Sequence, residues 1–173
     1  MQALNKDKNV KRLVLVGVVS ALAIVLGYLE QMIPLPINVP GVKLGLSNIC
    51  VIVALYITDW KSTFAISLIK SFVCGILFWG IGGTVYGVAG AVLSFIAMAL
   101  IKKSKMLGVI GVSVVGAVFH NLGQLIALFI MSGSFSFIYY LSVLGIAAVI
   151  TGAVTGTISA VIIGRIGHLH KGK

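Results

Sequence analysis

Six apolar runs follow one another along the chain, and they restrict its fold more than any other feature. They cover residues 12–33, 44–59, 62–79, 83–102, 108–131 and 137–165. A helix of about 20 apolar residues crosses the hydrocarbon core of a bilayer, and the third run is expected to be a short or tilted span. With 60% of residues hydrophobic and 9% charged, the chain lacks the polar surface of a soluble domain. We therefore expect an all-α integral membrane protein, in which residues 1–173 form one transmembrane domain, a bundle of six helices.

Residues that break helices or carry charge separate the runs. They are Pro34, Pro36 and Pro40, the charged segment 59–61, the glycine-containing turn 79–83, the lysines of 102–105, and the segment 132–134. No segment is left that could form a soluble domain.

The basic residues predict which ends of the runs face the cytoplasm, because short cytoplasmic loops carry an excess of lysine and arginine. With six spans, all basic residues beside the runs except Lys43 fall on one side. They are Lys6, Lys8, Lys11, Arg12, Lys61, Lys102, Lys103, Lys105, Arg165, Lys171 and Lys173. We predict a multi-pass protein of the bacterial cell (plasma) membrane with both termini cytoplasmic. No cleavable signal peptide is recognised, so the first run is expected to remain as a span.

The same distribution accounts for the formal charge of +10 without nucleic acid as a partner, because the basic residues form short clusters at the ends of runs. Cys50 and Cys74 lie inside apolar runs, where we expect small buried side chains rather than a disulfide. Neither a metal nor a cofactor is predicted.

Lys70 lies near the middle of the third run, where an ammonium is costly unless it faces the protein interior. It shares one helical face with Thr63, Ser67, Ser71 and Cys74, at spacings of three and four residues. This polar stripe predicts a face that points into the bundle. A substrate or ion contact is the favoured role of Lys70, and a lysine that extends to the interface is the alternative.

The fifth run contributes His120 and Gln124, which lie one turn apart and share a face with Gly116. They can contact a ligand or form hydrogen bonds between helices, and the sequence does not separate the two roles. No second histidine or carboxylate stands at the spacing of a metal site.

Three further polar residues gather at the outer ends of the runs if the N-terminus is inside. Glu30 ends the first run, Lys43 precedes the second, and Asn48 lies at its start. Free amides and the helix dipole make such a helix start favourable for anions. Together with the polar residues of the third and fifth runs, they predict a pocket that opens to the outside and takes a ligand with an anionic or carbonyl-rich end. Glu30 is either a solvated cap at the interface or the partner of Lys43, of Lys70 or of a cationic group on a ligand.

The sequence indicates binding rather than catalysis. It contains no nucleophile beside a base, no paired carboxylates and no phosphate-binding loop. We therefore predict no catalytic residue and do not expect an enzyme.

Small residues recur every four positions in three runs, a spacing that lets helices pack closely. The first run has Gly17 and Ala21; the fourth has Gly83, Gly87 and Ala91; the sixth has Gly152, Gly156, Ala160 and Gly164. Packing within the bundle and docking of a second membrane subunit both explain this pattern.

Two short motifs give the chain a family resemblance. KLGLSN, residues 43–48, starts the second run, and SLIKSFVCG, residues 67–75, lies in the third. With six short runs and a proline-broken loop, they resemble the substrate-binding S components of energy-coupling-factor vitamin transporters. Within that group, PGVKLGLSNI, residues 40–49, most resembles the Gx transporter family, also described as heptaprenyl diphosphate synthase component I. Gly45 and Asn48 stand where many S components carry acids.

The resemblance implies a membrane-embedded substrate-binding subunit of a small-molecule or vitamin-type uptake transporter, energised by a separate transmembrane coupling subunit and ATPases. It also implies that small residues of the first helix, here Gly17 and Ala21, dock the coupling subunit. The alternative is a non-catalytic membrane component associated with polyprenyl diphosphate or quinone metabolism. Three acidic residues in the whole chain cannot supply the aspartate-rich motifs of an isoprenyl synthase. A self-sufficient channel or carrier is a third hypothesis.

Overall fold

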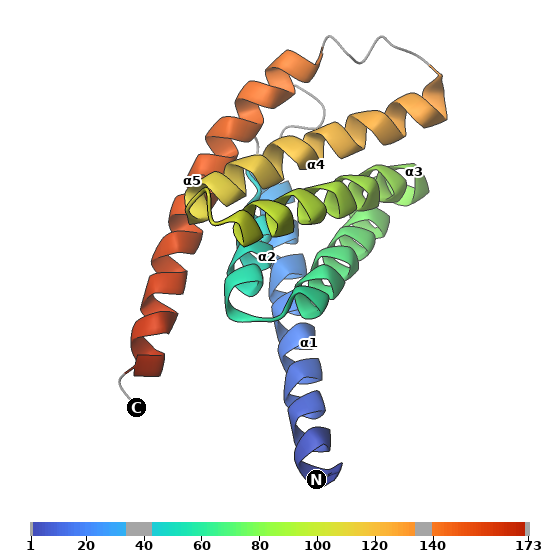
Figure 1. The fold of residues 1–173 in the computed structure, drawn as a ribbon. Coiled ribbons are helices and arrows are strands. Elements are labelled where there is room, and N and C mark those ends of the chain that lie inside the picture. Colours follow the sequence, from blue (N-terminus) through green and yellow to red (C-terminus); the bar gives the residue numbers. More distant parts are fainter. Residues whose placement is uncertain (1, 34–42, 134–139, 172–173) are drawn as a thin grey trace.

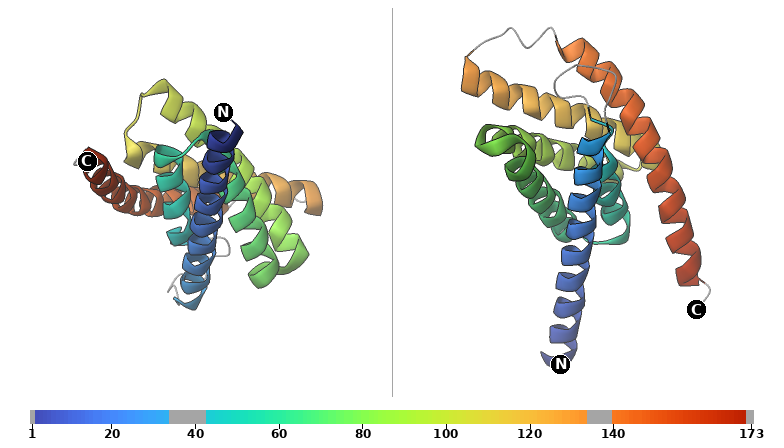
Figure 2. Two further views of the ribbon diagram at one scale, coloured as in Figure 1. Left: turned by 90° about the horizontal axis from the view of Figure 1, so that it is seen from below. Right: turned by 180° about the vertical axis from the view of Figure 1, so that it is seen from behind.

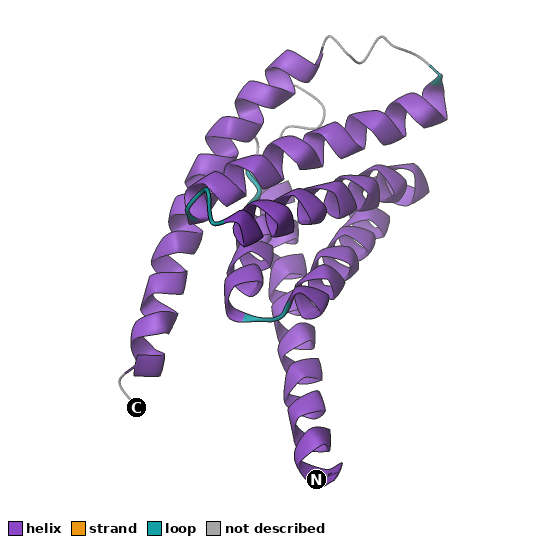
Figure 3. Cartoon of the chain, viewed as in Figure 1, coloured by secondary structure: helices purple, strands orange, loops and turns teal. Residues whose placement is uncertain are grey.

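A computed structural model describes residues 2–33, 43–133 and 140–171, which form five helices (Figure 1). These are α1 (Gln2–Met32), α2 (Leu46–Ile57), α3 (Trp60–Ser104), α4 (Val109–Ser132) and α5 (Tyr140–Lys171). No strand occurs among the described residues (Figure 3). The predicted all-α architecture is confirmed, whereas the predicted count of six helices is not. The expected breaks at Pro34, Pro36 and Pro40 lie outside the described residues.

The third and fourth expected runs belong to one helix, α3, which is 45 residues long. Its backbone leaves helical geometry at Gly80, where φ is 67° and ψ is −167°. Glycine adopts this conformation readily, and other residues adopt it at a considerable energetic cost. The two arms of α3, residues 60–79 and 81–104, fold back beside each other at this point (Figures 1 and 2). The turn expected at 79–83 is thus made by one residue, which explains why no loop divides α3 into two elements.

Four helices of the described chain are long and apolar enough to cross a membrane, as a multi-pass protein requires. Their candidate spans are Asn9–Met32, Trp60–Ser104, Val109–Ser132 and Leu141–Gly167. Helix α2 is shorter than the run predicted at 44–59. Its 12 residues extend roughly 18 Å, well short of the ~30 Å hydrocarbon core.

Helix α2 lies inside the molecule and contributes much of the hydrophobic core. The core cluster consists of Val51, Ile52, Ala54 and Leu55 from α2, Ile66, Phe95 and Met98 from α3, and Val112 from α4. Two turns limit α2 to this length. Gly45 precedes it with a left-handed φ of 78°, and the backbone becomes extended at Thr58, where φ is −122° and ψ is −179°.

Glycines set the closest approaches between helices. A methyl group on Gly152 of α5 would lie 2.7 Å from the Cα of Val114 in α4, and one on Gly75 would lie 2.6 Å from the Cα of Thr84 across the α3 reversal. Gly164, by contrast, has nothing within 4 Å of such a methyl group. The small-residue pattern of the sixth run therefore serves packing inside the bundle at Gly152, and Gly164 takes no part in it.

The N-terminal end of α1 and the C-terminal end of α5 lie toward the same end of the molecule (Figures 1 and 2). On α1, Arg12 Nη2 forms an ion pair with Asp59 Oδ2 at 2.6 Å. Asp59 also begins α3, because its side chain accepts a hydrogen bond from the Ser62 backbone N–H. This contact joins α1 to the turn between α2 and α3.

Candidate functional site

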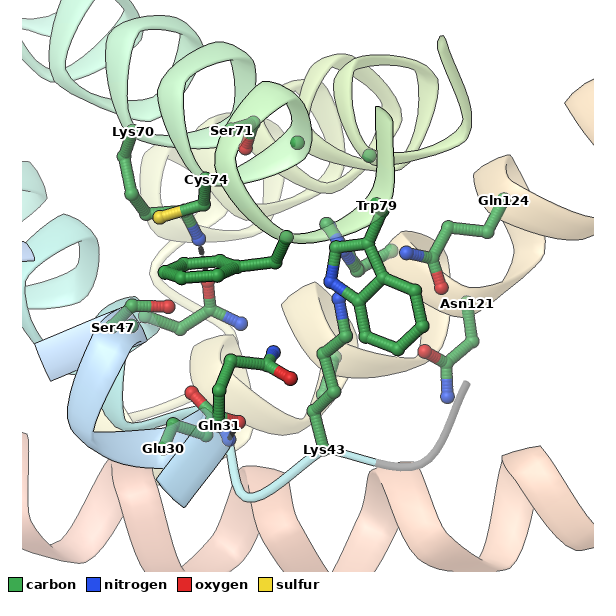
Figure 4. A pocket seen from close by; sticks show the side chains of 18 of the residues that line it. Glu30, Gln31, Lys43, Ser47, Lys70, Ser71, Cys74, Trp79, Asn121 and Gln124 are labelled. Atoms are coloured by element: carbon green, nitrogen blue, oxygen red, sulfur yellow. Dashed lines mark hydrogen bonds between the residues drawn. The ribbon is translucent and has the colours of Figure 1, made fainter. Parts of the chain in front are cut away.

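A polar pocket lies between the five helices (Figure 4). The space between its atoms measures about 850 Å³, a volume that includes the open solvent at its mouth. All six residues predicted to bind substrate line it: Glu30, Lys43, Asn48, Lys70, His120 and Gln124. The structure thus brings these residues to one place, and their role in binding remains a prediction.

Lys70, on the first arm of α3, has only 6% of its surface exposed. Its Nζ donates a hydrogen bond of 2.6 Å to Asn48 Oδ1 of α2 (Figure 4). A buried ammonium needs such partners, since desolvation without them is costly. An ammonium carries three donors, so the bond to Asn48 leaves Lys70 with the capacity to bind a ligand.

Glu30 is also buried, with 8% of its surface exposed. Its Oε1 accepts a hydrogen bond of 2.6 Å from the backbone N–H of Gly45, which ties the end of α1 to the start of α2. The carboxylate interacts electrostatically with both Lys43 and Lys70. Glu30 therefore has a structural role as well as a place in the charge balance of the pocket.

Lys43 lies outside the membrane-spanning segments and reaches toward Trp79 (Figure 4). Its Nζ is 4.8 Å from the centroid of the Trp79 ring, a distance at which a cation is attracted by an aromatic face. Burial lowers the pKa of Lys43 from its ordinary value of 10.5, and the Glu30 carboxylate opposes this shift. The sequence offered Glu30 as a partner for this ammonium or for Lys70, and it did not predict the contact with Trp79.

Helix α4 places His120 and Gln124 in the pocket by packing tightly against the second arm of α3. A methyl group on Gly90 would lie 2.7 Å from the His120 carbonyl oxygen and 3.0 Å from Gln124 Cγ. Beside them, Asn121 Nδ2 donates a hydrogen bond of 3.0 Å to the Leu144 carbonyl of α5. Asn121 therefore uses its amide to join helices, whereas the Gln124 amide has no such bond to another helix among the described residues.

Ser71 is a pocket residue that was not selected from the sequence as a binding residue. It lines the pocket with 5% of its surface exposed, and its Oγ has no hydrogen-bond partner among the described residues. Its position on the polar stripe beside Lys70 was the available signal. Thr63 belongs to the same stripe but bonds to the Asp59 carbonyl instead, so the stripe is partly structural.

The described residues include no group of three or more His, Cys, Asp and Glu side chains that could hold a metal ion. Besides the Glu30 carboxylate and the Cys74 thiol, the pocket presents two ammonium groups, an imidazole, amides and hydroxyls. These groups can donate hydrogen bonds and balance negative charge.

Gly17 and Ala21, the predicted docking residues, lie apart from the pocket. Both are exposed on α1, and a methyl group on Gly17 would meet nothing within 4 Å.

No curated protein and no solved structure matches the chain. One family model does match, and its description is heptaprenyl diphosphate synthase component I. The match covers residues 19–162, a range that extends from α1 to α5 and includes every residue of the pocket. This apolar helical chain therefore belongs to the heptaprenyl diphosphate synthase component I family.

Proposed function

We propose that the protein is the membrane-embedded substrate-binding subunit of a small-molecule uptake transporter, energised by a separate coupling subunit and ATPases. The observation that carries this proposal is the convergence of Lys43 and Lys70 on one polar pocket among apolar helices. Charged residues within membrane proteins are costly, and they typically mark substrate or ion sites.

The pocket residues divide the work of binding between them. Lys43 and Lys70 attract the anionic or carbonyl-rich end of the ligand, and His120 and Gln124 offer hydrogen bonds from α4. Asn48 holds the Lys70 ammonium in place through its 2.6 Å bond. Catalysis is not part of the proposal.

The direct test is to purify the protein in lipid nanodiscs, identify the small molecule that accompanies it by mass spectrometry, and titrate that molecule back by calorimetry. Lys70→Ala should weaken binding by about 1–3 kcal/mol, the value of a charge-assisted hydrogen bond. Lys103→Ala is the matched control, because Lys103 is exposed at the end of α3. If Lys70→Ala folds and binds the ligand as tightly as Lys103→Ala, the pocket is not the site of ligand binding.

The coupling subunit is proposed to dock on the face of α1 that carries Gly17 and Ala21. Gly17→Leu and Ala21→Leu should reduce co-purification with the coupling subunit and leave ligand binding unchanged. Gly164→Leu in α5 also fills open space at a glycine and serves as the control. Normal co-purification of both α1 variants would remove this assignment.

We propose a second candidate because the family is described as heptaprenyl diphosphate synthase component I. It is a non-catalytic membrane component associated with polyprenyl diphosphate or quinone metabolism. In that case the protein would bind a catalytic synthase subunit and hold a prenyl lipid rather than serve an ATPase-driven module. Affinity purification from the native membrane distinguishes the two candidates. Recovery of a prenyl synthase subunit without ATPases would favour the second.

A further inference from the structure

A second cavity adjoins the polar pocket. Its volume is about 700 Å³, open space included, and eight residues line it: Lys43, Trp79, Gly83, Tyr86, Gln124, Leu125, Leu128 and Leu144. Four of these, namely Lys43, Trp79, Gly83 and Gln124, also line the polar pocket. The two cavities are therefore neighbours with a shared wall.

The two cavities differ in chemistry on either side of that wall. Glu30, Lys70 and Ser71 line the polar pocket alone, whereas leucines from α4 and α5 line the second cavity alone. Lys43 and Trp79 stand between them, held together by the 4.8 Å cation–ring contact. A molecule that occupies both cavities must be polar at one end and apolar at the other.

The charges of the lining restrict the polar end. Lys43 and Lys70 contribute two positive charges, and Glu30 contributes one negative charge and interacts with both. The formal sum is one positive charge, so a single negative charge on the ligand balances the site. A group with several negative charges would leave unbalanced charge in a buried place, which is costly.

We propose that the two cavities form one binding site for a monoanionic amphiphile, namely a carboxylate with an apolar chain. The carboxylate lies between Lys43 and Lys70, and the Ser71 hydroxyl, which has no partner among the described residues, donates to it. The chain passes Trp79 and lies along Leu125, Leu128 and Leu144. This inference rests on the proposed binding function and names its substrate class.

Trp79 provides a local readout. The chain has two tryptophans, so Trp60→Phe leaves Trp79 as the only one, at the boundary of the two cavities. In nanodiscs, octanoate should shift the emission of this variant and saturate. Trp79→Phe retains only Trp60, at the start of α3 and outside both cavities, and should show no saturable shift.

Chain length tests the apolar cavity. Burial of one methylene contributes roughly 0.8 kcal/mol, or about fourfold in affinity, so octanoate should bind on the order of a hundredfold more tightly than butanoate. Leu125→Phe/Leu128→Phe fills the cavity and should abolish this preference. Ile126 lies on the exposed face of the same helix, so Ile126→Phe should keep the preference for octanoate over butanoate. This variant is the control for partition of the longer acid into lipid.

Ligands that differ only in the polar end test the charge balance of the site. Geranate and geranyl diphosphate share one apolar chain, and geranate should bind more tightly. Octanol, which lacks the charge, should bind no more tightly to the parent than to Lys43→Ala.

Three results would overturn the inference: no preference for octanoate over butanoate, an unchanged preference in Leu125→Phe/Leu128→Phe, or tighter binding of geranyl diphosphate than of geranate. Each leaves the proposed function intact if Lys70→Ala still loses the co-purified ligand. A different result would refute the proposed function itself: a co-purified ligand whose affinity is the same for the parent and for Lys70→Ala.

Discussion

At the scale of single residues, the pair of Lys70 and Asn48 explains how this chain accommodates a cation in its interior. The Asn48 Oδ1 accepts from an ammonium that is 6% exposed. A neutral partner satisfies one donor and leaves the positive charge in the pocket, whereas an acid would cancel it. An amide at position 48 therefore suits a site that attracts an anion.

Asn48→Leu removes this acceptor and leaves a buried donor unsatisfied. We expect a loss of stability of about 1–3 kcal/mol, seen as a lower midpoint of thermal unfolding in detergent. Asn48→Asp is the informative companion, because it restores an acceptor and cancels a positive charge. It should unfold near the parent midpoint but bind an anionic ligand more weakly. An Asn48→Leu variant as stable as the parent would show that the hydrogen bond does not stabilise the fold.

At the scale of elements, Gly80 decides that α3 doubles back on itself. Its φ of 67° and ψ of −167° belong to a region that is nearly restricted to glycine. Gly80→Ala should therefore destabilise the protein by about 1–3 kcal/mol. The measurement is thermal unfolding in nanodiscs.

Gly82→Ala is the control for this prediction, because Gly82 also has nothing within 4 Å of an added methyl group but no positive φ. Alanine is the better helix former, so this variant should be as stable as the parent or slightly more stable. Equal destabilisation by both substitutions would show that loss of glycine flexibility, and not the turn geometry, is responsible.

The same elements show how far the sequence predicts the fold. The apolar runs correctly indicate helices, since a long apolar segment has few alternatives in a bilayer. They do not indicate where a helix ends. The run at 44–59 is mostly apolar, yet α2 covers only Leu46–Ile57, because the backbone leaves helical geometry at Gly45 and Thr58. Composition likewise cannot show that one residue, Gly80, reverses α3 without a loop.

The sequence predicts those residues of the pocket whose burial in a membrane protein has a high energetic cost. Lys70 stands out because an ammonium in an apolar run requires an explanation, and the structure places it in the pocket. Ser71 does not stand out, because a helical hydroxyl usually bonds to the backbone of its own helix, as Thr151 does to the Ala147 carbonyl. The leucines of the second cavity resemble any lipid-facing leucine in sequence. They become recognisable only when α4 and α5 are placed beside Trp79.

At the scale of the whole molecule, the ion pair of Arg12 and Asp59 joins α1 to the turn before α3. Burial would raise the pKa of Asp59, but hydrogen bonds from Ser62 and the charge of Arg12 outweigh it and lower the pKa from its ordinary value of 3.8. A carboxyl with a depressed pKa in the folded state stabilises the fold above pH 3.8, and this contribution is lost as the pH falls through the folded-state value.

The unfolding midpoint of the parent should therefore fall more steeply below pH 3.8 than that of Asp59→Asn. Both side chains are 45% exposed, so the difference at neutral pH should be small, about 0.2–1 kcal/mol. The measurement is a series of thermal unfolding curves against pH. Parallel curves for the two proteins would mean that the pair does not stabilise the fold.

Topology is the remaining prediction at this scale. The ends of α4 should lie on opposite sides of the membrane, with Ser104 and the turn after α3 in the cytoplasm and Met131 outside. We expect Ser104→Cys to react with a membrane-impermeant maleimide only after permeabilisation, and Met131→Cys to react in intact cells. Cys50→Ala/Cys74→Ala provides the background for both. Reaction of both positions from one side contradicts the proposed topology.

The shortness of α2 has a consequence for how the chain enters the membrane during synthesis. A segment of 12 residues is too short to be retained by the insertion machinery as an independent span. We expect α2 to insert together with α1 and α3, two of its neighbours in the finished molecule. Because Ala147, Ala148 and Thr151 of α5 line the pocket, the pocket is complete only once the last helix has been made. A nascent chain arrested before α5 should therefore be inserted and yet unable to retain a ligand.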